Sequence, residues 1–194
     1  MQQELRETNI RFVDNDVNSA ETGRSHRVED GGFRKPCPDD GPAVWKLVAE
    51  CPPLEVNSAY CNLLQCTHFT DTCVLAEDDG GVIGWVSAYR PPSVPNQVFV
   101  WQVAVAIRAR GRGLGGRMLD TLLARPALRD VTTLAATITE ENAASWSLFT
   151  SLARRHGARM ERRPMFDRAA HFVNSHASEH LVTIGPLVAG TQNP

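Results

Sequence analysis

The sequence lacks an excess of charge of either sign and lacks any long apolar run, and each absence excludes a class of protein. The formal net charge is −2 at pH 7, with acidic and basic residues mixed along the chain, so no general attraction to nucleic acid or to a membrane surface is expected. No segment approaches the roughly 18 apolar residues of a transmembrane helix, and the first residues lack the apolar region of a secretory signal. We therefore expect no membrane and no nucleic-acid partner.

Cysteine is present, but without the spacing of a disulfide framework. The chain has no paired C-x-x-C spacing, and its five cysteines are an odd number: Cys37, Cys51, Cys61, Cys66 and Cys73. We interpret them as ordinary thiols of a reducing compartment. The sequence therefore predicts a soluble globular protein of the cytoplasm.

Composition divides the chain into two parts. Residues 1–32 are rich in Asn, Asp, Glu, Arg, Ser and Gly and contain few large apolar residues. Such a segment cannot bury enough apolar surface to offset its conformational entropy, so we expect a disordered tail. Residues 33–190 hold the apolar segments, show no internal repeat and are long enough for one domain with a substantial core.

The most informative stretch is residues 98–124. Val98 to Val105 is apolar and β-branched, as in a buried strand. A basic, glycine-rich turn follows at residues 110–116, and from Leu114 the apolar residues recur at helical spacing. This order is typical of a phosphate site, because the free N–H groups and the macrodipole of the first helical turn attract an anion.

Two phosphate-binding motifs overlap on this turn. Gly111, Gly113 and Gly116 have the G-x-G-x-x-G spacing of a dinucleotide site, with Asp130 at about the expected distance downstream. Residues 110–115 equally spell R-x-x-G-x-G, in which side-chain charge supplements the backbone. Three arginines would supply charge-assisted donors: Arg110, Arg112 and Arg117. A turn that merely reverses the chain is the third interpretation, and no P-loop motif is present.

The preceding strands distinguish the two motifs. Residues 72–77 and 82–89 are rich in strand-forming residues and are joined by an Asp-Gly turn, which predicts a hairpin. A proline-rich turn at residues 91–96 then leads into the strand that begins at Val98. Three strands on short turns form an antiparallel meander, whereas the dinucleotide fold needs parallel strands with long crossovers. The meander favours the R-x-x-G-x-G interpretation.

The other expected elements are short strands and helices. Asp39 or Asp40 is expected to cap a helix that ends at Pro52-Pro53. The remaining elements are a strand at 33–36, a helix at 58–68, a strand at 131–138, a helix at 143–156, strands at 159–166 and 181–184, and a polar loop or short helix at 167–180.

At this point the chain resembles a known group of enzymes. R-x-x-G-x-G after a strand is similar to the pyrophosphate motif of the GNAT superfamily of N-acetyltransferases. Four further segments resemble, within that superfamily, the family of diaminobutyrate acetyltransferases of ectoine biosynthesis: NSAYCNLL at 57–64, FVWQVAV at 99–105, NAASW at 142–146 and HASEHL at 176–181. The resemblance covers about residues 33–185. It implies an α/β fold with a mixed, mostly antiparallel sheet, helices on both faces and a splay near the cofactor, and homodimers are usual.

The resemblance assigns the acetyl-CoA site. In the family the pantetheine arm bonds backbone groups at a bulge of the central strand, which correspond here to Val103 and Val105, and a backbone N–H there would stabilise the oxyanion. Asn142 matches a position that contacts the cofactor, although Asn is also a preferred helix cap. The pyrophosphate would lie on the glycine-rich turn, at Arg110, Gly111, Arg112, Gly113, Gly115 and Gly116. No metal is expected.

The resemblance also assigns the acceptor site, to positions matching Glu55, Tyr60, Trp101, His176 and Glu179. The two carboxylates would bind the two ammonium groups of diaminobutyrate, and Glu179 would accept the proton that frees the reacting amine. Trp101 offers a cation–π contact. At the position of Glu55 the family is expected to have Asp, which leaves its exact contact open. From the residues alone, a core tryptophan and an exposed loop fit equally well.

One position departs from the superfamily pattern. Many members have a tyrosine seven residues after the equivalent of Asn142, where it protonates the leaving thiolate, and this chain has Phe149. A phenyl ring donates no proton, so the role is vacant or filled elsewhere; Tyr60 is the candidate. Coenzyme A also has a thiol pKa near the value of about 8.5 for cysteine, so its thiolate can leave without a proton.

Residues 176–180 allow a second interpretation, as part of the zinc site of a hydrolase. Residues 176–180 spell H-x-x-E-H, which binds zinc in some metalloproteases when it lies on a helix. No third ligand follows, because residues 181–194 contain no His, Cys, Asp or Glu.

The expected function is transfer of acetyl from acetyl-CoA to the 4-amino group of L-2,4-diaminobutyrate. The alternatives are a GNAT enzyme for another small amine and, because of Phe149, a GNAT domain that binds acyl-CoA without turnover.

Overall fold

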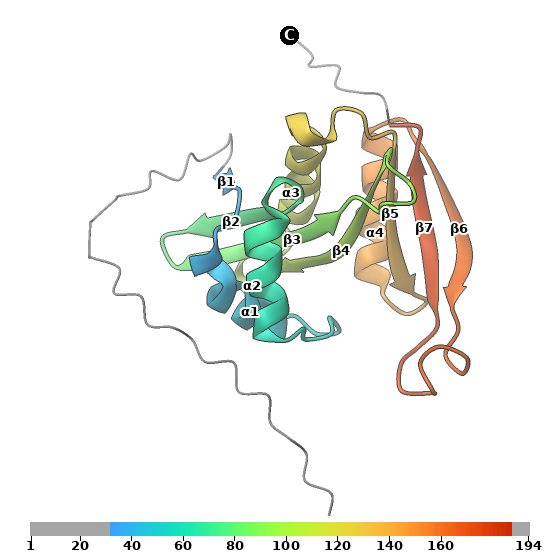
Figure 1. Cartoon of the computed structure of the whole chain (residues 1–194), viewed down its shortest axis with the longest axis horizontal. Coiled ribbons are helices and arrows are strands. Elements are labelled where there is room, and N and C mark those ends of the chain that lie inside the picture. The colour runs from blue at the N-terminus through green and yellow to red at the C-terminus, as the bar shows by residue number, and fades with distance from the viewer. Residues whose placement is uncertain (1–31, 188–194) are drawn as a thin grey trace, which may run out of the picture.

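The computed structural model describes residues 32–187, so the tail expected at residues 1–32 lies, apart from Gly32, outside the described residues. Within this part of the chain, one seven-stranded sheet has the order β1-β2-β3-β4-β5-β7-β6 (Figure 1). Neighbouring strands are antiparallel except β4 and β5, which are parallel. The expected mixed, mostly antiparallel sheet is confirmed.

The elements have the following bounds. The strands are β1 Phe33–Arg34, β2 Val74–Asp78, β3 Gly81–Tyr89, β4 Gln97–Val105, β5 Thr133–Thr139, β6 Arg159–Phe166 and β7 Glu179–Gly185. The helices are α1 Gly41–Ala49, α2 Ala59–His68, α3 Leu114–Leu123 and α4 Ala143–Arg155. None of the described helices is long and apolar enough to cross a membrane.

The two faces of the sheet bury two separate clusters, as alternation along the strands requires. Val74 and Ala76 of β2 face the larger cluster, which contains the apolar sides of α3 and α4. Leu75 faces the other way, into a smaller cluster with Val44 of α1 and Trp85 of β3. Helices therefore cover both faces, as expected, with α1 and α2 on one side and α3 and α4 on the other (Figure 1).

The antiparallel meander is confirmed, because β2, β3 and β4 pair in sequence. The bounds at the end of the chain differ from expectation. Strand β7 begins at Glu179, since Glu179 and His180 pair with Thr139 and Ile138 of β5. The expectation of a loop that reaches residue 180 is therefore wrong by two residues, and Glu179 has the fixed direction of a strand residue.

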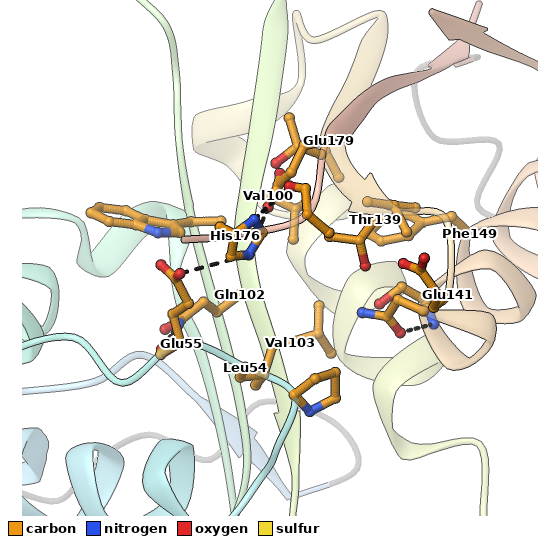
Figure 2. A pocket seen from close by; sticks show the side chains of 18 of the residues that line it. Leu54, Glu55, Val100, Gln102, Val103, Thr139, Glu141, Phe149, His176 and Glu179 are labelled. Atoms are coloured by element: carbon orange, nitrogen blue, oxygen red, sulfur yellow. Dashed lines mark hydrogen bonds and ion pairs between the residues drawn. The ribbon is translucent and has the colours of Figure 1, made fainter. Parts of the chain in front are cut away.

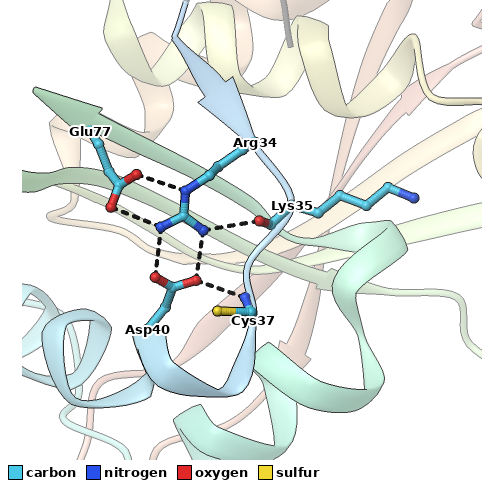
Figure 3. Close-up of polar contacts among 5 residues, drawn as sticks. All are labelled: Arg34, Lys35, Cys37, Asp40 and Glu77. Carbon is cyan, nitrogen blue, oxygen red and sulfur yellow. Dashed lines mark hydrogen bonds and ion pairs between the residues drawn. The ribbon is translucent and has the colours of Figure 1, made fainter. Parts of the chain in front are cut away.

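Asp40 precedes α1, as expected, but its side chain does not cap that helix. Both carboxylate oxygens accept hydrogen bonds from the guanidinium of Arg34, at 2.7 and 2.6 Å, and Arg34 makes a second two-bonded contact with Glu77 of β2 (Figure 3). Burial alone would raise the pKa of Asp40, but the bonds from Arg34 and from the Cys37 N–H lower the pKa below its usual value. The contacts tie β1, the start of α1 and β2 together.

Candidate active site

The two parallel strands at the centre of the sheet separate before they end. Strand β4 pairs with β5 only from Gln97 to Val100. Both strands continue beyond that point, and a pocket of about 610 Å³ lies between their ends, lined by residues of both strands (Figure 2). The expected splay is present, and this pocket lies within it.

A β-bulge turns β4 toward this pocket. Ser87 of β3 pairs with Gln102, but Ala88 pairs with Val100, so Trp101 has no partner across the ladder. In a regular strand, neighbouring side chains point to opposite faces. Because of the extra residue, all four residues from Val100 to Val103 line the pocket.

A second pocket, of about 360 Å³, lies against the glycine-rich turn. Its lining includes Val103, Val105 and six residues of the turn and first helical residues: Arg110, Gly111, Gly113, Leu114, Gly115 and Gly116. The two pockets share Pro53, Leu54, Val103, Asn142 and Ser145. A ligand with an anionic end on the turn and a reactive end near Val103 would therefore reach from one pocket into the other.

The glycines of the turn have different roles. Gly111 and Gly113 have φ angles of +75° and +69°, which side-chain-bearing residues rarely adopt. Gly115 is helical, and an added Cβ would meet only Leu148 and Val103 at ordinary contact distances of 3.5 Å or more. Gly116 lies under the guanidinium of Arg155, 3.1 Å from where its Cβ would be. The spacing of the motif does not distinguish these four glycines, whereas their backbone angles and neighbouring atoms do.

The three arginines near the turn also differ. Arg110 lines the second pocket, and its Nε donates to the carbonyl oxygen of Val105 at 3.0 Å. Arg112 is exposed and lines neither pocket. Arg117 lies over the ring of Phe33, with its guanidinium carbon 5.6 Å from the ring centroid. The expectation that Arg117 adds a donor to the turn is wrong, because one helical turn carries its side chain toward β1.

Three of the expected acceptor residues meet at the first pocket (Figure 2). Nε2 of His176 lies 3.6 Å from the Glu55 carboxylate and 3.8 Å from the Glu179 carboxylate. The other ring nitrogen, Nδ1, lies 2.6 Å from the carbonyl oxygen of Ala177, so it carries a proton and donates there. The ring also lies 4.6 Å from that of Phe172, centroid to centroid. His176 is thus held with Nε2 toward both carboxylates.

Trp101 and Tyr60 are placed differently from each other. Trp101 lines the first pocket and is partly exposed there, as an acceptor-binding residue requires. Tyr60 is 69% exposed on α2 and lines neither pocket. Within the described chain, the structure therefore does not bring Tyr60 to the other site residues.

Asn142, which directly precedes α4, and Phe149, which lies on α4, line the first pocket. Oδ1 of Asn142 accepts a hydrogen bond from the Ser145 N–H at 3.1 Å, so Asn142 is both the cap of α4 and a lining residue. Phe149 is buried. Its ring lines the pocket and has no hydroxyl group to donate a proton there.

Sequence reasoning missed six polar lining residues: Gln102, Thr137, Thr139, Glu141, Ser145 and Ser175. Only Gln102 left a usable signal, because it is the one polar side chain in the apolar run from Val98 to Val105. The positions of Glu141 and Ser145 depend on how α4 packs, which spacing does not give.

The H-x-x-E-H segment does not form a metal site here. Glu179 and His180 lie on β7 and not on a helix. His180 faces Arg162, whose Nη2 lies 3.0 Å from its Nε2, whereas His176 faces the pocket. Among residues 32–187, no group of three or more His, Cys, Asp or Glu side chains is arranged to hold a metal ion.

Comparison with known proteins agrees with this geometry. The model of the acetyltransferase (GNAT) family matches residues 42–153, and the chain belongs to this family. The ribosomal-protein-S18-alanine N-acetyltransferase from Escherichia coli has the same fold, with a TM-score of 0.62 at 14% identity, over 84% of this chain and 97% of that one.

Closer relatives narrow the group. L-2,4-diaminobutyric acid acetyltransferases from Methylotuvimicrobium alcaliphilum and Vibrio cholerae are 46% and 47% identical, over 80% and 78% of this chain and 90% and 88% of theirs. The structure of diaminobutyrate acetyltransferase EctA from Paenibacillus lautus, in complex with L-2,4-diaminobutyric acid and coenzyme A, matches with a TM-score of 0.77 at 35% identity, over 79% of this chain and 93% of that one. Within the GNAT family, this chain belongs with these diaminobutyrate acetyltransferases, and the resemblance stated from its sequence is confirmed.

Proposed function

We propose that this protein transfers the acetyl group of acetyl-CoA to the 4-amino group of L-2,4-diaminobutyrate. The product is N4-acetyl-L-2,4-diaminobutyrate, for synthesis of the compatible solute ectoine. One observation carries the proposal: a pocket lined by three carboxylates shares five lining residues with the pocket of the glycine-rich turn. Relatives of known activity and the complex of the Paenibacillus lautus enzyme support the same assignment.

Charge matches the acceptor pocket to a diamine. Glu55, Glu141 and Glu179 line it, and no described Lys or Arg does. At neutral pH, diaminobutyrate carries two ammonium groups and one carboxylate, so carboxylates in the pocket attract its cationic side. The ring of Trp101, at the bulge, adds a flat surface for an ammonium group.

The acetyl-CoA pocket supplies the other substrate. The pyrophosphate would lie at the N-terminus of α3, with Gly111, Gly113, Gly115 and Gly116 allowing close approach and Arg110 and Arg112 adding charge. The pantetheine arm would run along β4 at Val103 and Val105 and past Asn142. The thioester would then lie where the two pockets meet.

The reaction joins these groups. Glu179 accepts the extra proton of the amine, directly or through water, because its side chain is only 20% exposed and lies at the pocket wall beside His176. The amine lone pair attacks the thioester carbon, and a backbone N–H of β4 near Val103 stabilises the resulting oxyanion. The carbon–sulfur bond then breaks, and coenzyme A leaves as the thiolate. The amide nitrogen gives up its second proton to solvent water, and the thiolate is protonated from solvent, so that one proton is released overall. Glu55 and His176 bind the second ammonium group of diaminobutyrate and so orient the substrate in the pocket.

Two further statements belong to the proposal. None of the five cysteines, which all lie in the described part of the chain, forms a disulfide, which fits a cytoplasmic enzyme, and a homodimer is expected because dimers are usual in the superfamily. Light scattering after size-exclusion chromatography tests the dimer: a mass near 21.3 kDa would contradict it and a doubled mass would support it.

The function itself is tested by thiol release from acetyl-CoA. Purified protein is supplied with L-2,4-diaminobutyrate, ornithine, lysine or no amine, and the acetylated nitrogen is located by NMR. Release that depends on diaminobutyrate, with acetyl on the 4-nitrogen, is the expected result. Thiol release with ornithine or lysine but not with diaminobutyrate would show that another amine is the acceptor. Binding of acetyl-CoA without thiol release in any assay would contradict the proposal that the protein is an enzyme.

A further inference from the structure

Gln102 has an environment that the proposed chemistry does not explain. It lies in β4 directly after the bulge residue Trp101, and it is only 6% exposed. A buried amide without partners costs free energy, so such residues are retained where both ends are bonded. Both ends of the Gln102 amide are bonded, and both partners belong to one short segment of the chain.

The partners lie in the loop that precedes α2. Nε2 of Gln102 donates to the carbonyl oxygen of Glu55 at 2.8 Å. Its Oε1 accepts from Nδ2 of Asn57 at 3.0 Å. A carbonyl oxygen only accepts, so the orientation of the amide is fixed by the Glu55 bond and leaves Oε1 for Asn57. One side chain thus spans three residues of the loop.

A residue of α1 also makes a hydrogen bond to this loop. Nε1 of Trp45 in α1 donates to the carbonyl oxygen of Asn57 at 3.1 Å. Residues 55–57 belong to no helix or strand, so these contacts replace the ladder bonds that would otherwise hold their backbone. The loop is fixed between β4 and α1.

This loop carries one wall of the acceptor pocket. The Glu55 side chain is 74% exposed, and its carboxylate lies 3.6 Å from Nε2 of His176, which is longer than an ordinary hydrogen bond. A carboxylate so exposed is not held by its own contacts, because exposed pairs contribute little. Its direction is set by the backbone on which it stands, and Gln102 holds that backbone at the Glu55 carbonyl itself.

We infer that Gln102 is a positioning residue, which fixes the Glu55–Asn57 loop so that the Glu55 carboxylate faces the acceptor. The inference rests on the proposed function, since it assigns Gln102 to binding of the diamine and not of acetyl-CoA. Gln102 acts through Glu55 and leaves the reacting atoms to other groups. Placing this amide right after the bulge lets one strand distortion serve both the reacting centre and the acceptor wall.

The test is Gln102→Met, which keeps the side-chain length and removes both hydrogen bonds. The value of kcat/KM for the diamine is expected to fall about tenfold through KM, while the KM and Kd of acetyl-CoA stay unchanged. In a Glu55→Ala background the same substitution is expected to change kcat/KM by less than about twofold, because the group it positions is gone. A fall of equal size in both backgrounds would overturn the inference, and so would an unchanged kcat/KM in the first.

Gln65→Met is the matched control. Gln65 is also a buried glutamine with a side-chain bond, from Asn62 Nδ2 at 3.1 Å, and it lines neither pocket. The Gln65→Met substitution is expected to change neither the KM of the diamine nor the KM of acetyl-CoA. If Gln102→Met does not fold, Asn57→Ala removes one of the two bonds without altering β4, and a smaller rise in the diamine KM is expected; no rise would overturn the inference.

Hydrogen exchange of the amides of residues 54–58 separates this inference from the proposed function. Faster exchange there in Gln102→Met, with exchange in β5 unchanged, is expected whichever amine is the substrate. Unchanged exchange would overturn the positioning role. Absence of diamine-dependent thiol release from the unaltered protein would instead contradict the proposed function.

Discussion

Nε2 of His176 lies 3.6 Å from Oε1 of Glu55, so two loops more than a hundred residues apart in sequence meet at the acceptor pocket. On the other side of the same nitrogen lies Glu179, at 3.8 Å. Because Glu179 stands on a strand and Glu55 on a loop held by Gln102, the two carboxylates are positioned by unrelated parts of the fold. Substitutions at the two sites should therefore have separable effects.

Glu179→Gln should remove most turnover and leave acetyl-CoA binding intact. The amide keeps the shape of the side chain but accepts no proton, and loss of a general base costs roughly 10²- to 10⁴-fold in kcat. Thiol release measures kcat, and calorimetry measures the Kd of acetyl-CoA. Glu161→Gln is the control, since Glu161 is exposed on β6 and lines neither pocket. Unchanged kcat in Glu179→Gln would remove the role assigned to this residue.

Arg112→Ala should weaken the binding of acetyl-CoA and leave the KM of the diamine unchanged. Loss of one exposed charge near the pyrophosphate is expected to raise the Kd about three- to tenfold at low salt. Salt screens such contacts, so the Kd of the unaltered protein should rise more steeply with ionic strength than that of the variant. Arg129→Ala, at an exposed arginine outside both pockets, should behave as the unaltered protein does. An effect confined to the diamine would contradict the assignment.

Gly113→Ala and Gly115→Ala should separate backbone strain from ligand approach. Alanine at Gly113 must adopt a φ of +69°, which costs about 1–2 kcal/mol, so both stability and acetyl-CoA affinity should fall. Alanine at Gly115 meets no protein atom closer than 3.5 Å, so the melting temperature should hold while acetyl-CoA affinity falls. Thermal unfolding and calorimetry measure the two effects. Full affinity in Gly115→Ala would mean that the ligand does not approach this glycine.

Asp40→Asn should lower stability in a pH-dependent way. Leaving a buried charge without any partner costs about 3–5 kcal/mol. Arg34 keeps its contact with Glu77 when Asp40 is replaced, so the expected cost lies below that range. The pKa of Asp40 is lower in the folded than in the unfolded protein, where it is about 3.9. The stabilisation is therefore complete above about pH 4 and is lost as pH falls through the lowered pKa.

Urea unfolding at several pH values checks this prediction. The difference between the unaltered protein and Asp40→Asn should be largest at neutral pH and should narrow in acid. Asp71→Asn is the control, because its pair with Lys35 is largely exposed and contributes about 0–1 kcal/mol. A difference that stayed constant down to pH 2 would show that charge on Asp40 is not the cause.

Most of the fold could be predicted from the sequence, because its signals are local. The hairpin at residues 72–89 follows from alternating strand residues around an Asp-Gly turn, and the end of α3 follows from Arg125-Pro126. The side-chain cap expected of Asp40 is absent, since Asp40 pairs with Arg34, whose position depends on the pairing of β1 with β2. The pairing of β1 with β2 joins residues about 40 positions apart in sequence, so it cannot be predicted from local residue spacing.

The site was predictable only in part. The glycine-rich turn is a contiguous motif, so its place at the start of α3 followed from spacing. The acceptor residues came from a resemblance and stay predictions, and the fold brings His176, Glu55 and Glu179 together but leaves Tyr60 apart. Gln102 was missed because its partners are some 45 residues away in sequence. A buried polar residue in an apolar strand was its signal, and strand propensity gives that residue no role.

Beyond Val100, β4 pairs with β3 on one side and with no described strand on the other. An open strand edge at a protein surface invites another chain to add to the sheet, which is a route to aggregation. This edge faces a cleft between β4 and β5, and at its far end the Val105 carbonyl already accepts from Arg110. The part of β4 without a described strand partner on this side thus faces a cleft, where a ligand can reach its backbone groups.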